Sequence, residues 1–306
     1  MTAIGIALAL VLSILFPGII AIVKAKTAGR KPPSILQPLY DVIRLFRKGT
    51  IYSSTTSIIF QLAPLVYAAS VATALLFIPY FGGPGIFSFD GDFVFFAYLL
   101  GIGKFMMIIG AMDTGSGFEG MGANREAFYS LLIEPAFFLI MGSLALVTNH
   151  VSFLELFSAL HLNTHLSYLV ISVAVFVLVY ITMVENNRLP VDDPRTHLEL
   201  TMVHEVMVLD NSGFDLAIIH IASWMKFIIF GTIIANFLIP VLISIYIKIA
   251  LFVGVQVAFA VVVGLLESFR ARNKIAKNPQ WILAMSSLAI IVFLTTLIIT
   301  SKLILN

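Results

Sequence analysis

Residues 185–199 read ENNRLPVDDPRTHLE and begin a polar segment that separates two long apolar runs. This polar segment extends to residue 215 and holds seven of the sixteen acidic residues of the chain. An otherwise apolar chain that collects its titratable groups in one place is typical of proton handling, or of docking to a soluble partner.

The composition is that of a membrane protein. Of the 306 residues, 60% are hydrophobic and 11% are charged, whereas a soluble domain has about 25% charged residues. The chain has no cysteine, which excludes disulfides, thiolate nucleophiles, iron–sulfur clusters and attached c-type haem within it. The first apolar run lacks a basic start and a small-residue cleavage site, so we expect a retained transmembrane helix.

Hydropathy predicts an all-α, polytopic membrane protein that forms a single membrane domain over residues 1–306. A spanning helix needs about 20 mostly apolar residues. Eight segments satisfy this rule, namely 2–23, 57–79, 93–112, 127–148, 167–184, 216–238, 243–267 and 280–302. Residues 34–48 and 151–160 are shorter and amphipathic, which predicts two surface helices, the first on the cytoplasmic side.

The distribution of lysine and arginine predicts the orientation. With both termini outside, the cytoplasmic loops would be 24–56, 113–126, 185–215 and 268–279, and they hold fourteen of the eighteen basic residues. The outer loops 80–92 and 149–166 hold none, which is a clear positive-inside bias. We therefore expect a multi-pass protein of the inner (plasma) membrane whose polar segment faces the cytoplasm.

Four ionisable residues fall within or at the end of the apolar spans: Lys104, Glu134, Lys226 and Glu267. A charge in the hydrocarbon centre costs at least about 2.5–3.5 kcal/mol, so we expect these side chains to face the bundle interior or water. They could form a proton or ion relay, or buried ion pairs that fix helix register. Pro135 favours the relay for Glu134, because it frees a backbone carbonyl and can admit water. For the two lysines both interpretations stay open.

Two further patterns resemble a phosphate-binding loop and a zinc site, but neither fits the requirements of such a site. The glycine-rich loop 113–126 lacks the Gly-Lys-Ser/Thr of a phosphate loop and follows a membrane helix, so we expect a tight turn. His197 and His204 lie seven apart and could share a helix face, but the i, i+4 pair of a zinc site is absent. Titration or hydrogen bonding to a partner is the favoured role of these histidines, and no metal is expected.

The loop and the helix after it carry a family resemblance. DTGSGF at 113–118, GMGANRE at 120–126 and LIEP at 132–135 resemble the signature of the family that contains subunit 1 of respiratory complex I and its relatives in membrane-bound [NiFe] hydrogenases. LQPLYDVIRLF at 36–46, ENNRLPVD at 185–192, and the Glu267 and Arg272 region resemble other family motifs in order. The match is closer to the hydrogenase branch, typified by formate hydrogenlyase subunit 4.

The resemblance implies a coupling subunit without catalytic residues of its own, within a hydrogenase-type or NADH:quinone-type oxidoreductase complex. It implies a proton relay through Glu134, Glu185, Asp192, Glu199, Glu205, Lys104, Lys226 and Glu267. It implies partner docking through Asp41, Arg44, Asp113, Arg125, Glu126, Arg188, Arg195 and Arg272.

The expected partners are a hydrogenase-like large subunit, an iron–sulfur small subunit, antiporter-like membrane subunits and the lipid bilayer, with no nucleic acid. No cofactor is expected in this chain, and a [NiFe] centre, iron–sulfur clusters or quinone would lie on or beside the partners. Two alternatives remain, a quinone-chamber subunit of a complex I-type NADH dehydrogenase and a stand-alone secondary transporter. The paired repeats typical of many transporters are absent from the sequence.

Overall fold

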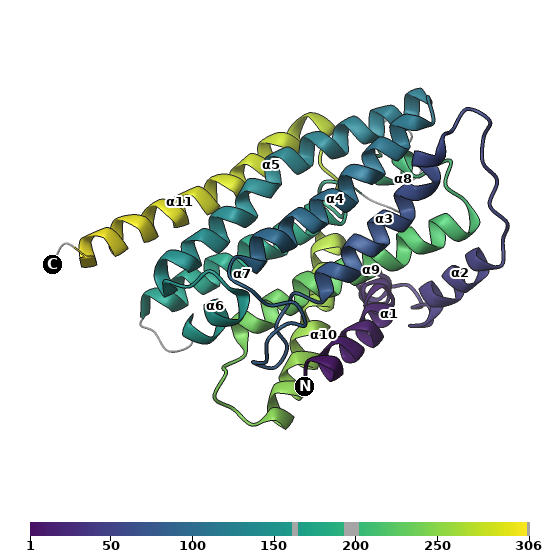
Figure 1. Cartoon of the computed structure of the whole chain (residues 1–306). Coiled ribbons are helices and arrows are strands. Elements are labelled where there is room, and N and C mark those ends of the chain that lie inside the picture. Colours follow the sequence, from purple (N-terminus) through teal and green to yellow (C-terminus); the bar gives the residue numbers. More distant parts are fainter. Residues whose placement is uncertain (161–164, 193–201, 305–306) are drawn as a thin grey trace.

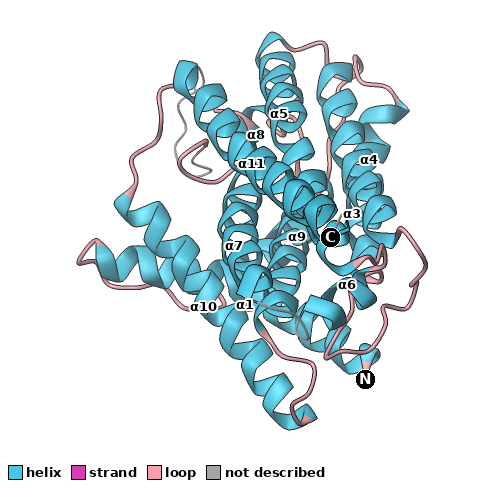
Figure 2. Cartoon of the chain, turned by 90° about the vertical axis from the view of Figure 1, so that its left-hand side faces the viewer, coloured by secondary structure: helices cyan, strands magenta, loops and turns pink. Residues whose placement is uncertain are grey.

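The computed structural model describes residues 1–160, 165–192 and 202–304, with only the backbone for 165–169 and 302–304. Within these ranges the ordered elements are helices (Figure 2). Their bounds are α1 Thr2–Thr27, α2 Gln37–Phe46, α3 Ile58–Leu75, α4 Asp92–Asp113, α5 Gly117–Thr148, α6 Phe153–Leu160, α7 His165–Glu185, α8 His204–Met207, α9 Gly213–Leu238, α10 Ile245–Phe269, the 3₁₀ turn Ile275–Lys277 and α11 Asn278–Ile304.

The long helices coincide with the eight predicted spans. Seven of them are long and apolar enough to cross a membrane, counted over the described residues. The remaining span corresponds to α7, whose fully described apolar part is Val170–Glu185. The least obvious boundary is also reproduced, since α9 ends at Leu238 and α10 begins at Ile245, on either side of Pro240. The prediction of an all-α polytopic membrane protein is confirmed.

Helix α9 lies in the middle of the bundle and contacts α1, α3, α7 and α10. Almost all of its residues from Trp224 to Phe237 are buried, and they include Lys226. Helices α5 and α11 pack together along one edge, whereas α1 and α10 pack together along the opposite edge (Figure 1). A polar group on α9 is therefore far from lipid and needs partners from the surrounding helices.

The two amphipathic segments both form helices, but they differ in how deeply they are buried. Helix α2 exposes Tyr40 and Ile43, while its Val42 packs against Ala217 and Trp224 of α9, as expected for a surface helix.

Helix α6 is not a surface helix, because its apolar face belongs to the core of the bundle. Phe153 and Phe157 are buried in it, and their rings stack 5.9 Å apart. The buried carboxylate of Asp92, on α4, accepts a hydrogen bond from the backbone N–H of Phe153 at 2.7 Å. The first N–H groups of a helix have no acceptor within the helix, and this bond supplies one for the start of α6 and fixes the helix inside the bundle.

The glycine-rich stretch is mostly helical, which corrects the predicted turn over 113–126. Helix α4 ends at Asp113 and α5 already begins at Gly117. Gly122 faces α8, and a Cβ atom there would lie 2.8 Å from the backbone oxygen of Val203, whereas Gly120 faces open space. Glycine at position 122 therefore allows α8 to close directly onto α5.

Candidate functional site: a buried cluster of charges

Glu185, the last residue of α7, is held by two lysines from neighbouring helices. Its Oε1 atom accepts a hydrogen bond from Lys104 Nζ of α4 at 2.8 Å, and its Oε2 atom lies 2.6 Å from Lys226 Nζ of α9. Lys226 Nζ also donates to the backbone oxygen of Glu185 at 2.8 Å. All three residues are buried. Because an unpaired charge is costly in apolar surroundings, this pairing explains how the bundle retains them.

Glu126 of α5 completes the group, and we call Lys104, Glu126, Glu185 and Lys226 the central cluster. Its Oε1 atom lies 3.5 Å from Lys104 Nζ, whereas its Oε2 atom is buried and has no hydrogen-bond partner among the described residues. The cluster lines a hollow of about 330 Å³ next to α8. Buried polar atoms of this kind are normally hydrogen-bonded to protein or to water, so the hollow is suited to hold bridging water.

Asp192 fixes α8 beside the central cluster. Its Oδ2 atom accepts hydrogen bonds from the backbone N–H groups of Val203 at 2.9 Å and His204 at 3.1 Å, and its Oδ1 atom pairs with Arg272. His204 lines the same hollow, and its Nδ1 atom is buried without a partner in the described part of the chain. Burial, with the positive charge of Lys226 nearby, lowers the pKa of His204 to about 3. The imidazole is therefore neutral at physiological pH.

Another buried carboxylate, Glu267, lies near the end of α10. Its Oε2 atom is 2.8 Å from Lys24 Nζ of α1, and its Oε1 atom is 3.3 Å from Arg188 Nη1. The Arg188 guanidinium also lies over the ring of Phe227, 5.1 Å from its centroid. We call Glu267, Lys24 and Arg188 the terminal cluster. It ties α1 and α10 to the segment that follows α7.

Glu134 lies on the outer surface of the bundle, although the sequence predicted an inward or water-facing position. Glu126 and Glu134 are eight residues apart on α5, which turns them roughly 80° from each other around the helix axis. Glu134 lines two hollows, one of about 560 Å³ shared with Lys104 and Glu185, and a more open one of about 800 Å³ on the face formed by α4 and α5. Glu134 thus lies between the central cluster and the outer face of the bundle.

The residues expected to dock a partner divide into exposed and inward-facing groups. Asp41 and Arg44 lie exposed on α2, with 3.9 Å between their charged atoms. Asp113 accepts a hydrogen bond from the backbone N–H of Ser57 at 2.6 Å, close to the start of α3. The first pair lies on the outer side of α2, and the second bond joins the end of α4 to the start of α3.

The other described docking residues turn toward the protein. Arg125 donates to the backbone oxygen of Met202 at 2.9 Å, while Glu126, Arg188 and Arg272 take part in the buried ion pairs described above. The structure therefore moves these four from a docking surface to internal contacts. Among the relay candidates Glu205 is half-buried on α8. Arg195, His197 and Glu199 lie outside the described residues.

Sequence reasoning missed several members of the site. It did not assign Glu126 to the buried charges, did not pair Lys24 with Glu267, and did not foresee the buried carboxylate of Glu119, which accepts a hydrogen bond from the backbone N–H of Asp210 at 2.9 Å. Local spacing carries no signal for these contacts, because they join segments far apart in the chain. Within the described residues, no group of three His, Cys, Asp or Glu side chains is placed to hold a metal ion.

Comparison with known proteins relates this architecture to membrane subunits of respiratory complexes. Hydrogenase-4 component C of Escherichia coli (strain K12) is 29% identical over 217 residues, which cover 70% of this chain and 66% of that protein. Formate hydrogenlyase subunit 4 of the same organism is 26% identical over 186 residues, which cover 61% of each. NADH-ubiquinone oxidoreductase chain 1 of Chondrus crispus is 28% identical over 192 residues, which cover 60% of this chain and 58% of that protein. The matched region thus spans less than two thirds of each of these relatives.

A solved structure shares the fold along almost the whole chain. It is a chain of the membrane-bound sulfane sulfur reductase, an archaeal respiratory membrane complex, with a TM-score of 0.77 and 19% identity over 96% of this chain and 98% of that one. The sequence profile of the NADH dehydrogenase family matches residues 1–301. Because this match covers nearly the entire sequence, the protein belongs to the NADH dehydrogenase family, the family of complex I subunit 1.

Proposed function

We propose that this chain is the membrane subunit of a hydrogenase-type oxidoreductase complex, and that it couples redox chemistry on a soluble arm to proton or sodium movement in the membrane. The relatives named as components of hydrogenase-4 and formate hydrogenlyase support the branch. The arm, with its large and iron–sulfur small subunits and their metal centres, would rest on the end of the bundle that carries α2 and the start of α5. Antiporter-like subunits would neighbour the chain within the bilayer.

One observation carries this proposal: the hollows around the central cluster follow one another toward the side of the bundle. Lys104 and Glu185 line both the hollow beside α8 and the one that reaches Glu134. Lys104 and Glu134 then line the open hollow on the face of α4 and α5. A proton could therefore pass from the region of His204, through the central cluster, to Glu134. A charge change on the arm would shift the proton affinity of the carboxylates along this path.

The test is Glu134→Gln in the assembled complex, in proteoliposomes that report both electron transfer and ion movement. Glutamine keeps the shape but cannot release a proton, so we expect assembly and electron transfer to persist and coupled ion movement to fall by about tenfold or more. Glu155→Gln is the matched control, because Glu155 is an exposed carboxylate that contacts His150 at the other end of the bundle. Unchanged ion movement in Glu134→Gln would disprove the relay.

The same complex distinguishes the alternatives. The relative named NADH-ubiquinone oxidoreductase chain 1 supports a quinone-chamber subunit, which would copurify with a flavin-containing arm. Copurification of nickel and iron supports the hydrogenase branch. A homo-oligomer that moves ions without any redox partner would support a stand-alone transporter and would disprove the proposed coupling role.

A further inference from the structure

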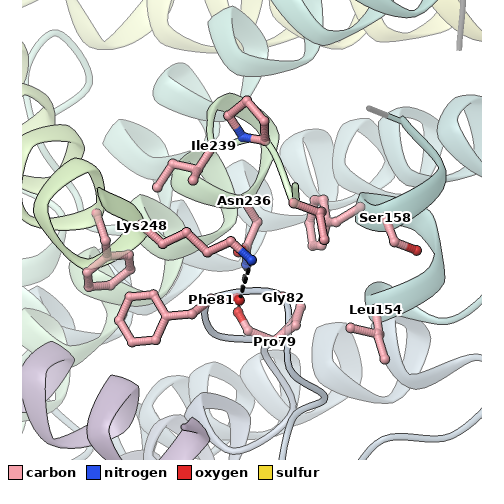
Figure 3. A pocket seen from close by; sticks show the side chains of 12 residues that line it. Pro79, Phe81, Gly82, Leu154, Ser158, Asn236, Ile239 and Lys248 are labelled. Atoms are coloured by element: carbon pink, nitrogen blue, oxygen red, sulfur yellow. Dashed lines mark hydrogen bonds between the residues drawn. The ribbon is translucent and has the colours of Figure 1, made fainter. Parts of the chain in front are cut away.

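A pocket lies at the end of the bundle opposite α8 and the terminal cluster. It is formed where the segment after α3, the end of α9, the start of α10 and one side of α6 meet, and about 450 Å³ of empty space lies among these elements, part of it open to solvent. Twelve residues line it, all of them described, and of these only Lys248 is charged (Figure 3). The walls are otherwise largely apolar, with Phe157 and Phe252 among the aromatic side chains.

The ammonium group of Lys248 points into this pocket. Its Nζ atom donates one hydrogen bond, to the backbone oxygen of Phe81 at 3.0 Å (Figure 3). A lysine ammonium has three donors, and the described residues occupy one of them, which leaves donors that a ligand can use. Gly82 keeps the approach open, because a Cβ atom there would lie 3.2 Å from Lys248 Nζ. Gly82 also has a φ of +81°, a conformation that other residues rarely adopt.

Lys248 differs from the three lysines of the two buried clusters. Lys24, Lys104 and Lys226 each lie within 4 Å of a carboxylate. Within the described part of the chain, Lys248 has no such ion pair. The predicted orientation places this end of the bundle outside, where basic residues are rare because they oppose the positive-inside bias. A lysine in this pocket that has no acid beside it among the described residues indicates that something else supplies the negative charge.

We propose that this pocket binds the phosphate of a membrane phospholipid. The ammonium would meet the phosphate as a compact point charge, and the apolar walls would contact the glycerol and the first part of an acyl chain. Inorganic phosphate shares the charge but has no apolar portion to match the walls. The position of the pocket, at the first turn of α10 and the last turn of α9, is at the level where phospholipid headgroups lie.

The test counts phospholipids bound to this subunit by native mass spectrometry of the complex released from mild detergent. Phosphatidylglycerol is added as the probe, and millimolar inorganic phosphate is added in a parallel sample. Lys248→Met removes the charge and keeps the length, whereas Lys248→Arg keeps the charge. Lys26→Met is the matched control, because it removes the charge of an exposed lysine in the last turn of α1, away from the pocket.

We expect the wild type, Lys248→Arg and Lys26→Met to retain one tightly bound phospholipid, whereas Lys248→Met should bind it about fivefold more weakly. Equal retention by Lys248→Met would overturn the proposal. An equal loss in Lys26→Met would overturn it as well, because the overall charge of the chain and not the charge in the pocket would then hold the lipid. Displacement of the lipid by inorganic phosphate would assign the pocket to a free anion.

Discussion

The central and terminal clusters are built from the same chemistry, since each is a buried carboxylate between two cations. Glu267 of the terminal cluster meets Lys24 and Arg188, whose side chains are 18% and 14% exposed. Glu185 of the central cluster meets Lys104 and Lys226, whose side chains are only 7% and 2% exposed. The central cluster also adjoins hollows and unpartnered polar atoms.

The difference teaches that pairing alone does not identify a functional site. Each cluster keeps one buried carboxylate oxygen without a hydrogen-bond partner among the described residues, Oε2 of Glu126 and Oε1 of Glu267, so this feature does not separate them. The central cluster differs because its cations are less exposed and because it opens onto the hollows that reach Glu134, which leaves room for proton exchange. The proposed coupling role therefore rests on the central cluster, whereas the terminal cluster joins α1 and α10 to the segment after α7.

The largest expected effect is on stability, and it compares the removal of one cation from each cluster. Lys226→Met removes one of the two cations at Glu185 and leaves an underpaired buried charge, which should lower the free energy of unfolding by about 3–5 kcal/mol. Lys24→Met should cost roughly 1 kcal/mol, because Lys24 reaches solvent and Arg188 remains at Glu267. Thermal unfolding of the purified complex measures both. Equal losses would show that the two clusters do not differ in their dependence on pairing.

A substitution at the contact of α5 with α8 should disturb the central cluster alone. Gly122→Ala places a Cβ atom against the backbone of Val203 and should destabilise the protein by about 1–3 kcal/mol. Gly120→Ala faces open space and should stabilise α5 by up to about 1 kcal/mol. Opposite shifts in unfolding temperature are the expected result. A matching loss in both variants would mean that the helix itself, and not the close approach of α8, requires glycine.

The pH dependence of stability should report on His204. The unfolded chain takes up a proton at this histidine near pH 6.5, whereas the folded chain does so only near its lowered pKa of about 3. The contribution of His204 is therefore fully present above pH 6.5 and is lost as the pH falls from 6.5 toward 3. Unfolding temperatures at pH 7.5 and 5.5 should differ more for the wild type than for His204→Gln. The same difference in both proteins would contradict the burial of a neutral imidazole.

The smallest effect on stability is expected outside both clusters, at the exposed pair on α2. Asp41→Asn should change the free energy of unfolding by less than about 0.5 kcal/mol, because both side chains are more than half exposed. If α2 helps to dock a soluble arm, the variant should release that arm at a lower salt concentration than the wild type. Ion-exchange stripping of membranes measures this release. An unchanged salt threshold would remove Asp41 from the docking surface.

The sequence predicted the helices of the bundle better than their rotation. Hydropathy located the long helices to within a few residues, except that α5 begins ten residues before the predicted span 127–148, because a membrane helix must be apolar only where it crosses the bilayer. It also located Lys104, Lys226 and Glu134 as rare intramembrane charges.

The facing direction of each helix could not be predicted in the same way. In a bilayer both the buried and the lipid-exposed faces are apolar, so hydropathy does not distinguish them. Glu126 was therefore placed near the membrane face, whereas the structure buries it, and the hollows beside the exposed Glu134 were not foreseen. The inward turn of Arg272 likewise depends on Asp192, eighty residues earlier in the chain, and no local pattern encodes such a contact.

Helix α5 runs without interruption over 32 residues, from Gly117 to Thr148. At 1.5 Å per residue this is roughly 48 Å, well beyond the roughly 30 Å of a hydrocarbon core. The first turns of α5 therefore stand clear of the acyl chains, while Glu134 lies on the same rod at the depth of the lipid tails. The end of α5 that α8 contacts and the carboxylate of Glu134 thus belong to one continuous helix, and Pro135, which removes a hydrogen bond from that helix, follows Glu134 directly.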